Sequence, residues 1–212
     1  MTWTKICGIN KKSDAEAIAK MGADCIGFIF STDSPRRIEL GQAKSILKGS
    51  GNIYRAGVFV NEKVEKIKSH IDYLGLDYVQ LSGDEGLDHI RKLKDAAGEV
   101  KIIKTLRLKK TGSQEASGIA RKYLEYADYI LLDSYDKYQY GGTGRTIDWE
   151  KVKGIVEPKK LIVSGGLYHG NAEKAIEILG PFGVDASSRL EASPGVKDLE
   201  MVKRFIKTVK GF

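Results

Sequence analysis

The chain has 212 residues, enough for one well-buried core and short for two full domains, so we expect a single domain over residues 1–212. Its 42% hydrophobic and 30% charged residues are typical of a globular protein, and no apolar run approaches the roughly 20 residues that span a bilayer. The segment from Met1 to Cys7 lacks the apolar stretch of a signal peptide, so we expect a cytoplasmic protein. A reducing compartment favours free thiols at Cys7 and Cys25.

The formal net charge of +7 permits two interpretations, a nucleic-acid partner or an anionic small substrate. The lysines are spread along the whole chain and alternate with acidic residues, without a basic cluster that aromatic residues interrupt. We therefore expect a small-molecule substrate and neither nucleic acid nor membrane as partner, in a monomer or a homodimer. His70, His89 and His169 lie far apart and form no metal motif, so we expect no metal site.

Short β-branched runs alternate along the chain with stretches of helical periodicity. The runs predicted to be strands are Thr4–Cys7, Cys25–Phe30, Tyr54–Val60, Tyr78–Leu81, Lys101–Leu106, Tyr129–Asp133, Leu161–Ser164 and Gly183–Ser187. A helix is expected after each strand. Ser13 and Glu16 form a capping-box pattern that predicts the start of the first helix, and Gly22 is expected to end it. In the last helix one face is apolar, with Leu199, Val202, Phe205, Ile206 and Val209.

Eight strand-then-helix units predict a closed (β/α)₈ barrel, the TIM-barrel architecture of the α/β class. The rival is an open, doubly wound sheet, which usually stops at five or six strands. No G-x-G-x-x-G pattern follows the first predicted strand, which also favours the barrel. One connection, Ser134–Ile147, is unusually long and is expected to be functional.

In such barrels the active site forms where the strands end, so polar residues at strand ends are the candidates. Cys7 ends the first strand and precedes a glycine, and Asp133 ends the apolar sixth strand. A thiol becomes a base when positive charge stabilises its thiolate, and partial burial makes a carboxylic acid a proton donor. The alternatives are a structural thiol and a rim carboxylate. Cys25 begins its strand, and we expect it in the core.

Small residues follow the last two strands, at Gly165-Gly166 and Ser187-Ser188. In (β/α)₈ barrels these two loops usually bind phosphate through backbone N–H groups. Ordinary tight turns are the alternative, because a pair of glycines alone is weak evidence.

With these residues the chain resembles the phosphoribosylanthranilate isomerases over nearly its whole length. The matching segments are Lys5-Ile6-Cys7-Gly8, Gly22-Ala23-Asp24, Gly27-Phe28-Ile29-Phe30, Ser34-Pro35-Arg36, Gly57-Val58-Phe59-Val60-Asn61, Val79-Gln80-Leu81, Leu132-Asp133, Gly141-Gly142-Thr143-Gly144, Gly165-Gly166-Leu167, Gly183-Val184-Asp185 and Ser187-Ser188. In this order and spacing they are specific. The resemblance implies an Amadori rearrangement in tryptophan biosynthesis, which converts N-(5-phosphoribosyl)anthranilate to 1-(2-carboxyphenylamino)-1-deoxyribulose 5-phosphate.

The resemblance also implies roles for individual residues. Asp133 is expected to protonate the ribose ring oxygen and Cys7 to remove the C2 proton, with the iminium as electron sink, so no cofactor is expected. Arg36 is expected to contact an anion, either the anthranilate carboxylate or charge near Cys7. Asp185 is expected to orient the sugar or a loop. The phosphate is expected on Gly165, Gly166, Ser187 and Ser188, under a closing loop that contains Gly141, Gly142, Thr143 and Gly144.

Two positions depart from the family pattern. After Gln80-Leu81 the family usually has His-Gly, whereas this chain has Ser82-Gly83 and so lacks an imidazole at the substrate. After Ser187-Ser188 the family usually has glycine, whereas this chain has Arg189, which resists positive φ and is expected either to add charge at the phosphate or to point away.

Two alternatives remain from the sequence. The related isomerase of histidine biosynthesis performs the same rearrangement with two aspartates, but an aspartate is expected there at the position of Cys7. The other alternative is a non-catalytic barrel that binds a phosphosugar, with Ser82 and Arg189 as signs of drift.

Overall fold

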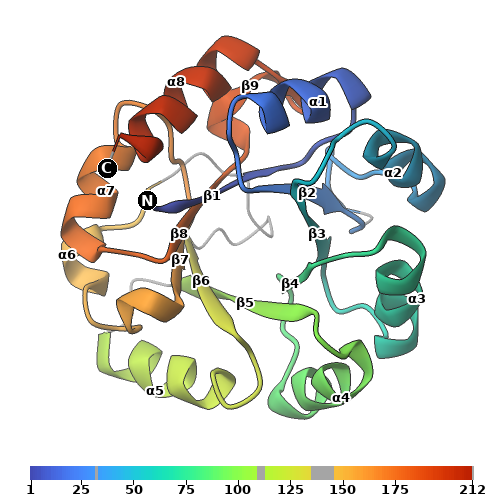
Figure 1. Cartoon of the computed structure of the whole chain (residues 1–212). Helices are drawn as coiled ribbons and strands as arrows, with labels where there is room; N and C mark the ends of the chain where they lie inside the picture. Colours follow the sequence, from blue (N-terminus) through green and yellow to red (C-terminus); the bar gives the residue numbers. More distant parts are fainter. Residues whose placement is uncertain (32, 109–112, 135–145, 212) are drawn as a thin grey trace.

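The computed structural model describes residues 1–31, 33–108, 113–134 and 146–211. Its parallel strands close into a barrel in chain order, with helices around the outside (Figure 1). The barrel strands are β1 (Trp3–Cys7), β2 (Cys25–Ile29), β3 (Tyr54–Phe59), β4 (Tyr78–Leu81), β5 (Lys101–Leu108), β6 (Tyr129–Ser134), β7 (Leu161–Val163) and β8 (Gly183–Ala186). The predicted barrel is confirmed, because each predicted strand matches an observed one to within two residues at either end.

The helices connect successive strands and pack against the barrel wall (Figure 1). They are α1 (Lys12–Lys20), α2 (Leu40–Leu47), α3 (Val64–Leu74), α4 (Leu87–Ala97), α5 (Ser113–Tyr123), α6 (Trp149–Val152), α7 (Ala172–Leu179) and α8 (Leu199–Lys210). Two 3₁₀ turns, η1 (Pro158–Lys160) and η2 (Ser188–Leu190), precede β7 and follow β8. A small antiparallel hairpin, β9 (Glu191–Ser193) and β10 (Val196–Lys197), lies between η2 and α8.

The start of α1 corrects the sequence prediction. The helix begins at Lys12, and the extended Lys11 precedes it without a capping side chain. Ser13 therefore lies inside the first turn and cannot cap it. A capping box is found instead at α2, where the Glu39 backbone N–H donates to the Gln42 side chain at 3.1 Å. Which residue can cap a helix depends on where the chain turns from the extended to the helical conformation. The residue pattern at Ser13 does not contain that information.

Hydrophobic burial follows the predicted faces. In α8 the side chains of Val202, Phe205, Ile206 and Val209 are buried, as the helical spacing predicted. Burying each such side chain contributes roughly 1.5–3 kcal/mol to stability. These residues belong to the main core between the barrel and its helices.

A second hydrophobic cluster fills the barrel interior toward the amino ends of the strands. It contains Trp3, Cys25, Ala56, Tyr78, Ile103, Leu131 and Ile162. Cys25 is fully buried in this cluster, as expected from its place at the start of a strand. Since this plug closes one end of the barrel, the polar residues further along the strands face the opposite end.

None of the described helices is long and apolar enough to cross a membrane. Within the same residues, no group of three or more His, Cys, Asp and Glu side chains is arranged to hold a metal ion.

Candidate active site

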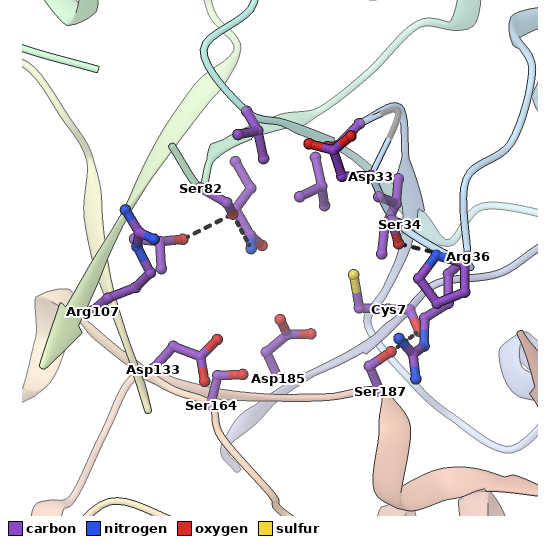
Figure 2. Close-up of a pocket in the computed structure, with 17 residues that line it drawn as sticks. Cys7, Asp33, Ser34, Arg36, Ser82, Arg107, Asp133, Ser164, Asp185 and Ser187 are labelled. Atoms are coloured by element: carbon purple, nitrogen blue, oxygen red, sulfur yellow. Dashed lines mark hydrogen bonds between the residues drawn. The ribbon is translucent and has the colours of Figure 1, made fainter. Parts of the chain in front are cut away.

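The carboxyl ends of the strands surround a cavity of about 270 Å³ (Figure 2). Its wall is built largely from polar side chains, namely Cys7, Ser31, Asp33, Ser34, Arg36, Gln80, Ser82, Thr105, Arg107, Asp133, Ser164, Asp185 and Ser187. Alternation along each strand explains this wall, since every second residue of a barrel strand points inward. The cavity lies at the end of the barrel where (β/α)₈ enzymes carry their active sites.

Cys7 and Asp133 both face this cavity, from β1 and β6. Figure 2 shows them on either side of Asp185. Both are buried, with 5% and 8% of their surface exposed, so a small molecule in the cavity would contact them away from bulk water. The structure thus brings together the thiol and the carboxylate that the sequence proposed as base and acid, and their chemical roles stay predictions.

A buried lysine lies beneath the cavity. Lys5 is fully buried in β1, and its Nζ donates to both carboxylate oxygens of Asp185 and to Oε1 of Gln80, each at 3.0 Å. Burial alone would lower the pKa of Lys5, but the acidic groups around it, Asp185 foremost, together outweigh burial and hold the pKa above its ordinary value. Lys5 is therefore an ammonium. Asp185, expected to orient sugar or loop, lines the cavity and is bound to this ammonium.

The Lys5 ammonium acts on the neighbouring thiol. Burial raises the pKa of Cys7, and the positive charge of Lys5 opposes that rise. The Asp185 carboxylate raises the pKa of Cys7 further. The balance leaves Cys7 mostly as a thiol at neutral pH in the free protein, so its use as a base depends on the charges around it.

The side chain of Arg36 lies beside the cavity, and a glutamate of the β9–β10 hairpin binds its guanidinium. The Nε donates to both oxygens of Glu191 at 2.9 and 3.0 Å, and Nη2 donates to Oε2 at 2.8 Å. Lys197 of the same hairpin donates to Oε1 of Glu191 at 2.7 Å. The Arg36 guanidinium, which was expected to bind a substrate anion, is thus hydrogen-bonded to Glu191. A direct contact of Arg36 with substrate stays a prediction.

Glycines let these groups approach the first strand closely. Gly8 has φ +79°, and a Cβ there would lie 2.9 Å from Cδ of Arg36 and 3.2 Å from Oγ of Ser187. Ser187 also donates to the carbonyl oxygen of Cys7 at 3.0 Å, and Lys197 donates to the carbonyl oxygen of Ser187 at 3.3 Å. The loop after β8, the hairpin and the end of β1 therefore form one connected unit around Cys7.

Exchange of Glu191 for glutamine is expected to destabilise this unit. Although burial opposes ionisation, hydrogen bonds and charge from Arg36 and Lys197 lower the pKa of Glu191. A carboxyl group with a depressed folded-state pKa adds stability above its unfolded pKa and loses it as the pH falls through the folded one. We expect Glu191→Gln to cost about 3 kcal/mol in the free energy of unfolding at neutral pH, measured by urea denaturation.

The matched control is Asp88→Asn in α4. Asp88 also bridges two cations, Arg91 and Lys92, but its side chain is 61% exposed. We expect Asp88→Asn to change the free energy of unfolding little. The loss of stability as the pH falls should become smaller only in Glu191→Gln. Equal effects of the two variants would show that the Glu191 cluster carries no special stability.

The residues proposed for phosphate binding come together around a smaller neighbouring cavity. Gly165, Gly166, Ser187, Ser188 and Arg189 all line it, together with Asp133, Ser164, Leu167, Asp185 and Ala186. Gly165 and Gly166 have φ of +87° and +63°, a backbone conformation that favours glycine and turns the chain after β7. The two predicted loops are therefore adjacent, as a shared anion site requires.

Arg189 is accommodated without backbone strain. Among the described non-glycine residues only Asn61 has a positive φ, so the family's glycine is replaced here without a left-handed arginine. The Arg189 guanidinium lies 5.4 Å from the ring centroid of Tyr168. A cation over an aromatic face is a favourable contact, and it holds the guanidinium beside the loop that follows β7.

Ser82 takes a place in the cavity wall where the family usually has histidine. Its Oγ accepts from Nε2 of Gln80 at 3.0 Å and shares a hydrogen bond with Oγ1 of Thr105 at 3.1 Å. Gln80 in turn receives a hydrogen bond from Lys5. The serine therefore extends a buried polar network instead of presenting an imidazole ring to the cavity.

Sequence reasoning missed several charged residues at the site: Asp33 and Arg107 in the cavity wall, and Lys5, Glu191 and Lys197 around it. Lys5 had a local signal, because a lysine inside an apolar strand, two residues before Cys7, must point to the same face. Glu191 and Lys197 had none, because Arg36, the residue that ties their hairpin to the site, lies 155 positions from Glu191. The expected substrate-covering loop at Gly141, Gly142, Thr143 and Gly144 lies outside the described residues.

A closed parallel barrel with a polar cavity at the carboxyl ends of its strands defines the class of (β/α)₈-barrel enzymes. The model of the family "N-(5'phosphoribosyl)anthranilate (PRA) isomerase" matches residues 4–208. The chain belongs to this family.

Individual relatives agree along the full length. The N-(5'-phosphoribosyl)anthranilate isomerase of Rubrobacter xylanophilus is 44% identical over 99% of this chain and 100% of its own. A monomeric form of the dimeric phosphoribosylanthranilate isomerase from Thermotoga maritima superposes with a TM-score of 0.84 at 34% identity, covering all of both chains. A phosphoribosylanthranilate isomerase in complex with reduced 1-(o-carboxyphenylamino)-1-deoxyribulose 5-phosphate gives the same values.

Proposed function

We propose that the chain converts N-(5-phosphoribosyl)anthranilate to 1-(2-carboxyphenylamino)-1-deoxyribulose 5-phosphate in tryptophan biosynthesis, with Cys7 as general base and Asp133 as general acid. Family membership makes the chain an isomerase of this kind. The observation that carries the residue roles is that the thiol and the carboxylate face one cavity from separate strands. A ribose between them would meet a proton donor on one side and a proton acceptor on the other.

The proposed reaction proceeds in three steps. Asp133 gives its proton to the ribose ring oxygen while the C1–O bond breaks, and the anilino nitrogen supplies the electron pair of the iminium. Cys7 then removes the C2 proton, the electrons of the C–H bond form the C1–C2 double bond of an enolamine, and the electrons of the C=N double bond return to the nitrogen. The enolamine tautomerises to the ketone. Each turnover leaves Cys7 with a proton and Asp133 without one. Before the next turnover Cys7 therefore releases a proton and Asp133 takes one up, and the pair again holds a single proton on Asp133.

The active enzyme therefore carries one proton on the pair, as thiolate and carboxylic acid. A pH–rate profile of this pair is bell-shaped, because loss or gain of one proton inactivates it. Its two apparent pKa values belong to the pair and to neither residue alone.

The phosphate is proposed to bind in the smaller cavity, on the backbone around Gly165, Gly166 and Ser188. Support comes from the convergence of the two loops and from the relative that binds a phosphorylated product analogue. Arg189 stands at this cavity and brings positive charge to it. As in the expectation from sequence, the working form is proposed to be a monomer or a homodimer.

A direct assay tests the proposed reaction. The fluorescence of the anthranilate group in N-(5-phosphoribosyl)anthranilate is expected to fall when purified protein is added, without added metal. The control is a protein in which Cys7→Ser and Asp133→Asn are combined, so that any slow decay of the substrate itself is subtracted. Equal rates with wild type and control would contradict the proposal.

A further inference from the structure

Lys5 is a buried charged residue next to the candidate active site that the proposed reaction does not use. Its side chain is fully buried and is absent from the wall of the cavity, so it does not contact a ligand there. Its Nζ has three oxygen partners at 3.0 Å, two on Asp185 and one on Gln80. A lysine side chain is costly to bury even when it is paired, so its place in the barrel calls for a function.

The thiol of Cys7 lies near this ammonium. Lys5 and Cys7 point to the same face of β1, and the neighbouring residue on β2 is Gly27, which pairs with Cys7 in the sheet. A Cβ at Gly27 would lie 2.9 Å from Sγ of Cys7, 3.0 Å from Cε of Lys5 and 3.2 Å from its Nζ. The ammonium and the thiol thus border the same small space, which the missing side chain of Gly27 leaves open.

We propose that Lys5 is a positioning residue for the base: its ammonium, fixed by Asp185 and Gln80, stands behind Cys7 and stabilises the thiolate that the reaction needs. This inference rests on the proposed function, since it assigns Lys5 a task only if Cys7 is the base. Lys5 touches neither the cavity nor the reacting atoms, and it acts through the sulfur alone.

The charges that face Cys7 act in opposite directions. Lys5 on β1 and Lys197 on β10 lower the pKa of the thiol, whereas Asp185 on β8 raises it. Four further charged groups, Asp33, Arg36, Arg107 and Asp133, line the same cavity. Lys5 and Asp185 form one ion pair, yet their removal has opposite effects on Cys7. Loss of Lys5 raises the pKa of the thiol, and loss of Asp185 lowers it.

That opposition gives a sharp test. The rate of alkylation by iodoacetamide is measured against pH without substrate, and the background from Cys25 is taken from Cys7→Ser. In Lys5→Met the pH midpoint of Cys7 alkylation is expected to rise by about one unit or more. In Asp185→Asn it is expected to fall below that of wild type. Because both variants break the same ion pair, a merely structural role would move the midpoint in one direction.

A third variant keeps the test decisive if Lys5→Met leaves Asp185 buried without its partner and fails to fold. Lys5→Met combined with Asp185→Asn replaces a buried ion pair by neutral groups, which proteins tolerate well. Its midpoint is expected above that of Asp185→Asn alone. Midpoints that move in the same direction in both single variants, or that agree between Asp185→Asn and the double variant, overturn the proposal.

Turnover gives a second, separate readout. Since Lys5 does not line the cavity, Lys5→Met is expected to lower kcat at least tenfold at neutral pH with KM changed less than threefold, in line with the loss of thiolate. The alkylation midpoints need no substrate, so they judge the role of Lys5 even if the enzyme acts on a different sugar phosphate. The opposite result, a raised KM with kcat kept, would place Lys5 in substrate binding instead.

Discussion

Replacement of Cys7 by serine is expected to lower kcat by at least about a thousandfold, in the upper part of the range for loss of a general base. A serine hydroxyl fills nearly the same space but does not ionise near neutral pH, so the C2 proton has no acceptor. The cavity keeps its shape, because the oxygen replaces sulfur at a position that is only 5% exposed. Binding of a reduced product analogue, measured by calorimetry, is therefore expected to stay close to wild type.

Cys25→Ser is the matched control for this prediction. Cys25 is fully buried in the hydrophobic plug at the other end of the barrel, away from the cavity. Its replacement is expected to cost stability while kcat is kept. A Cys7→Ser enzyme within tenfold of wild type would show that the thiol is not the base.

Replacement of Asp133 by asparagine is expected to lower kcat by about a hundredfold or more. The amide keeps the size of the side chain but has no acidic proton to give to the ribose ring oxygen, so opening of the furanose slows. Since Asp133 also borders the smaller cavity, product-analogue binding must be measured beside kcat to separate chemistry from anion binding. We expect that binding to change little.

The pH–rate profile separates a missing acid from a distorted site. Wild type is expected to give a bell, because both members of the pair titrate, and Asp133→Asn is expected to lose one of its two limbs. A variant that keeps both limbs and stays within tenfold of wild type would remove Asp133 from the proposed mechanism. The neighbouring Asp185 is not expected to replace it, because both of its oxygens accept hydrogen bonds from the Lys5 ammonium.

The sequence by itself determined the barrel and the location of the candidate pair. Apolar runs of regular spacing predict eight parallel strands, and closure of such strands brings their carboxyl ends to one mouth. Cys7 and Asp133 end their strands, so their meeting in one cavity follows from periodicity alone. The same reasoning placed Cys25 in the core and the glycine loops after β7 and β8 beside one another.

Only the tertiary structure decided which charges pair around the thiol. Lys5 and Asp185 lie 180 positions apart, and Arg36 and Glu191 lie 155 apart. Barrel closure sets β1 beside β8 and the hairpin beside Arg36, so contacts of this kind have no local pattern. The capping box at Ser13 failed for the related reason that chain geometry overrides a local motif. Sequence periodicity predicts which way a side chain points. Which residue becomes its partner depends on how the sheet closes, and so do the charges that shift the pKa of Cys7.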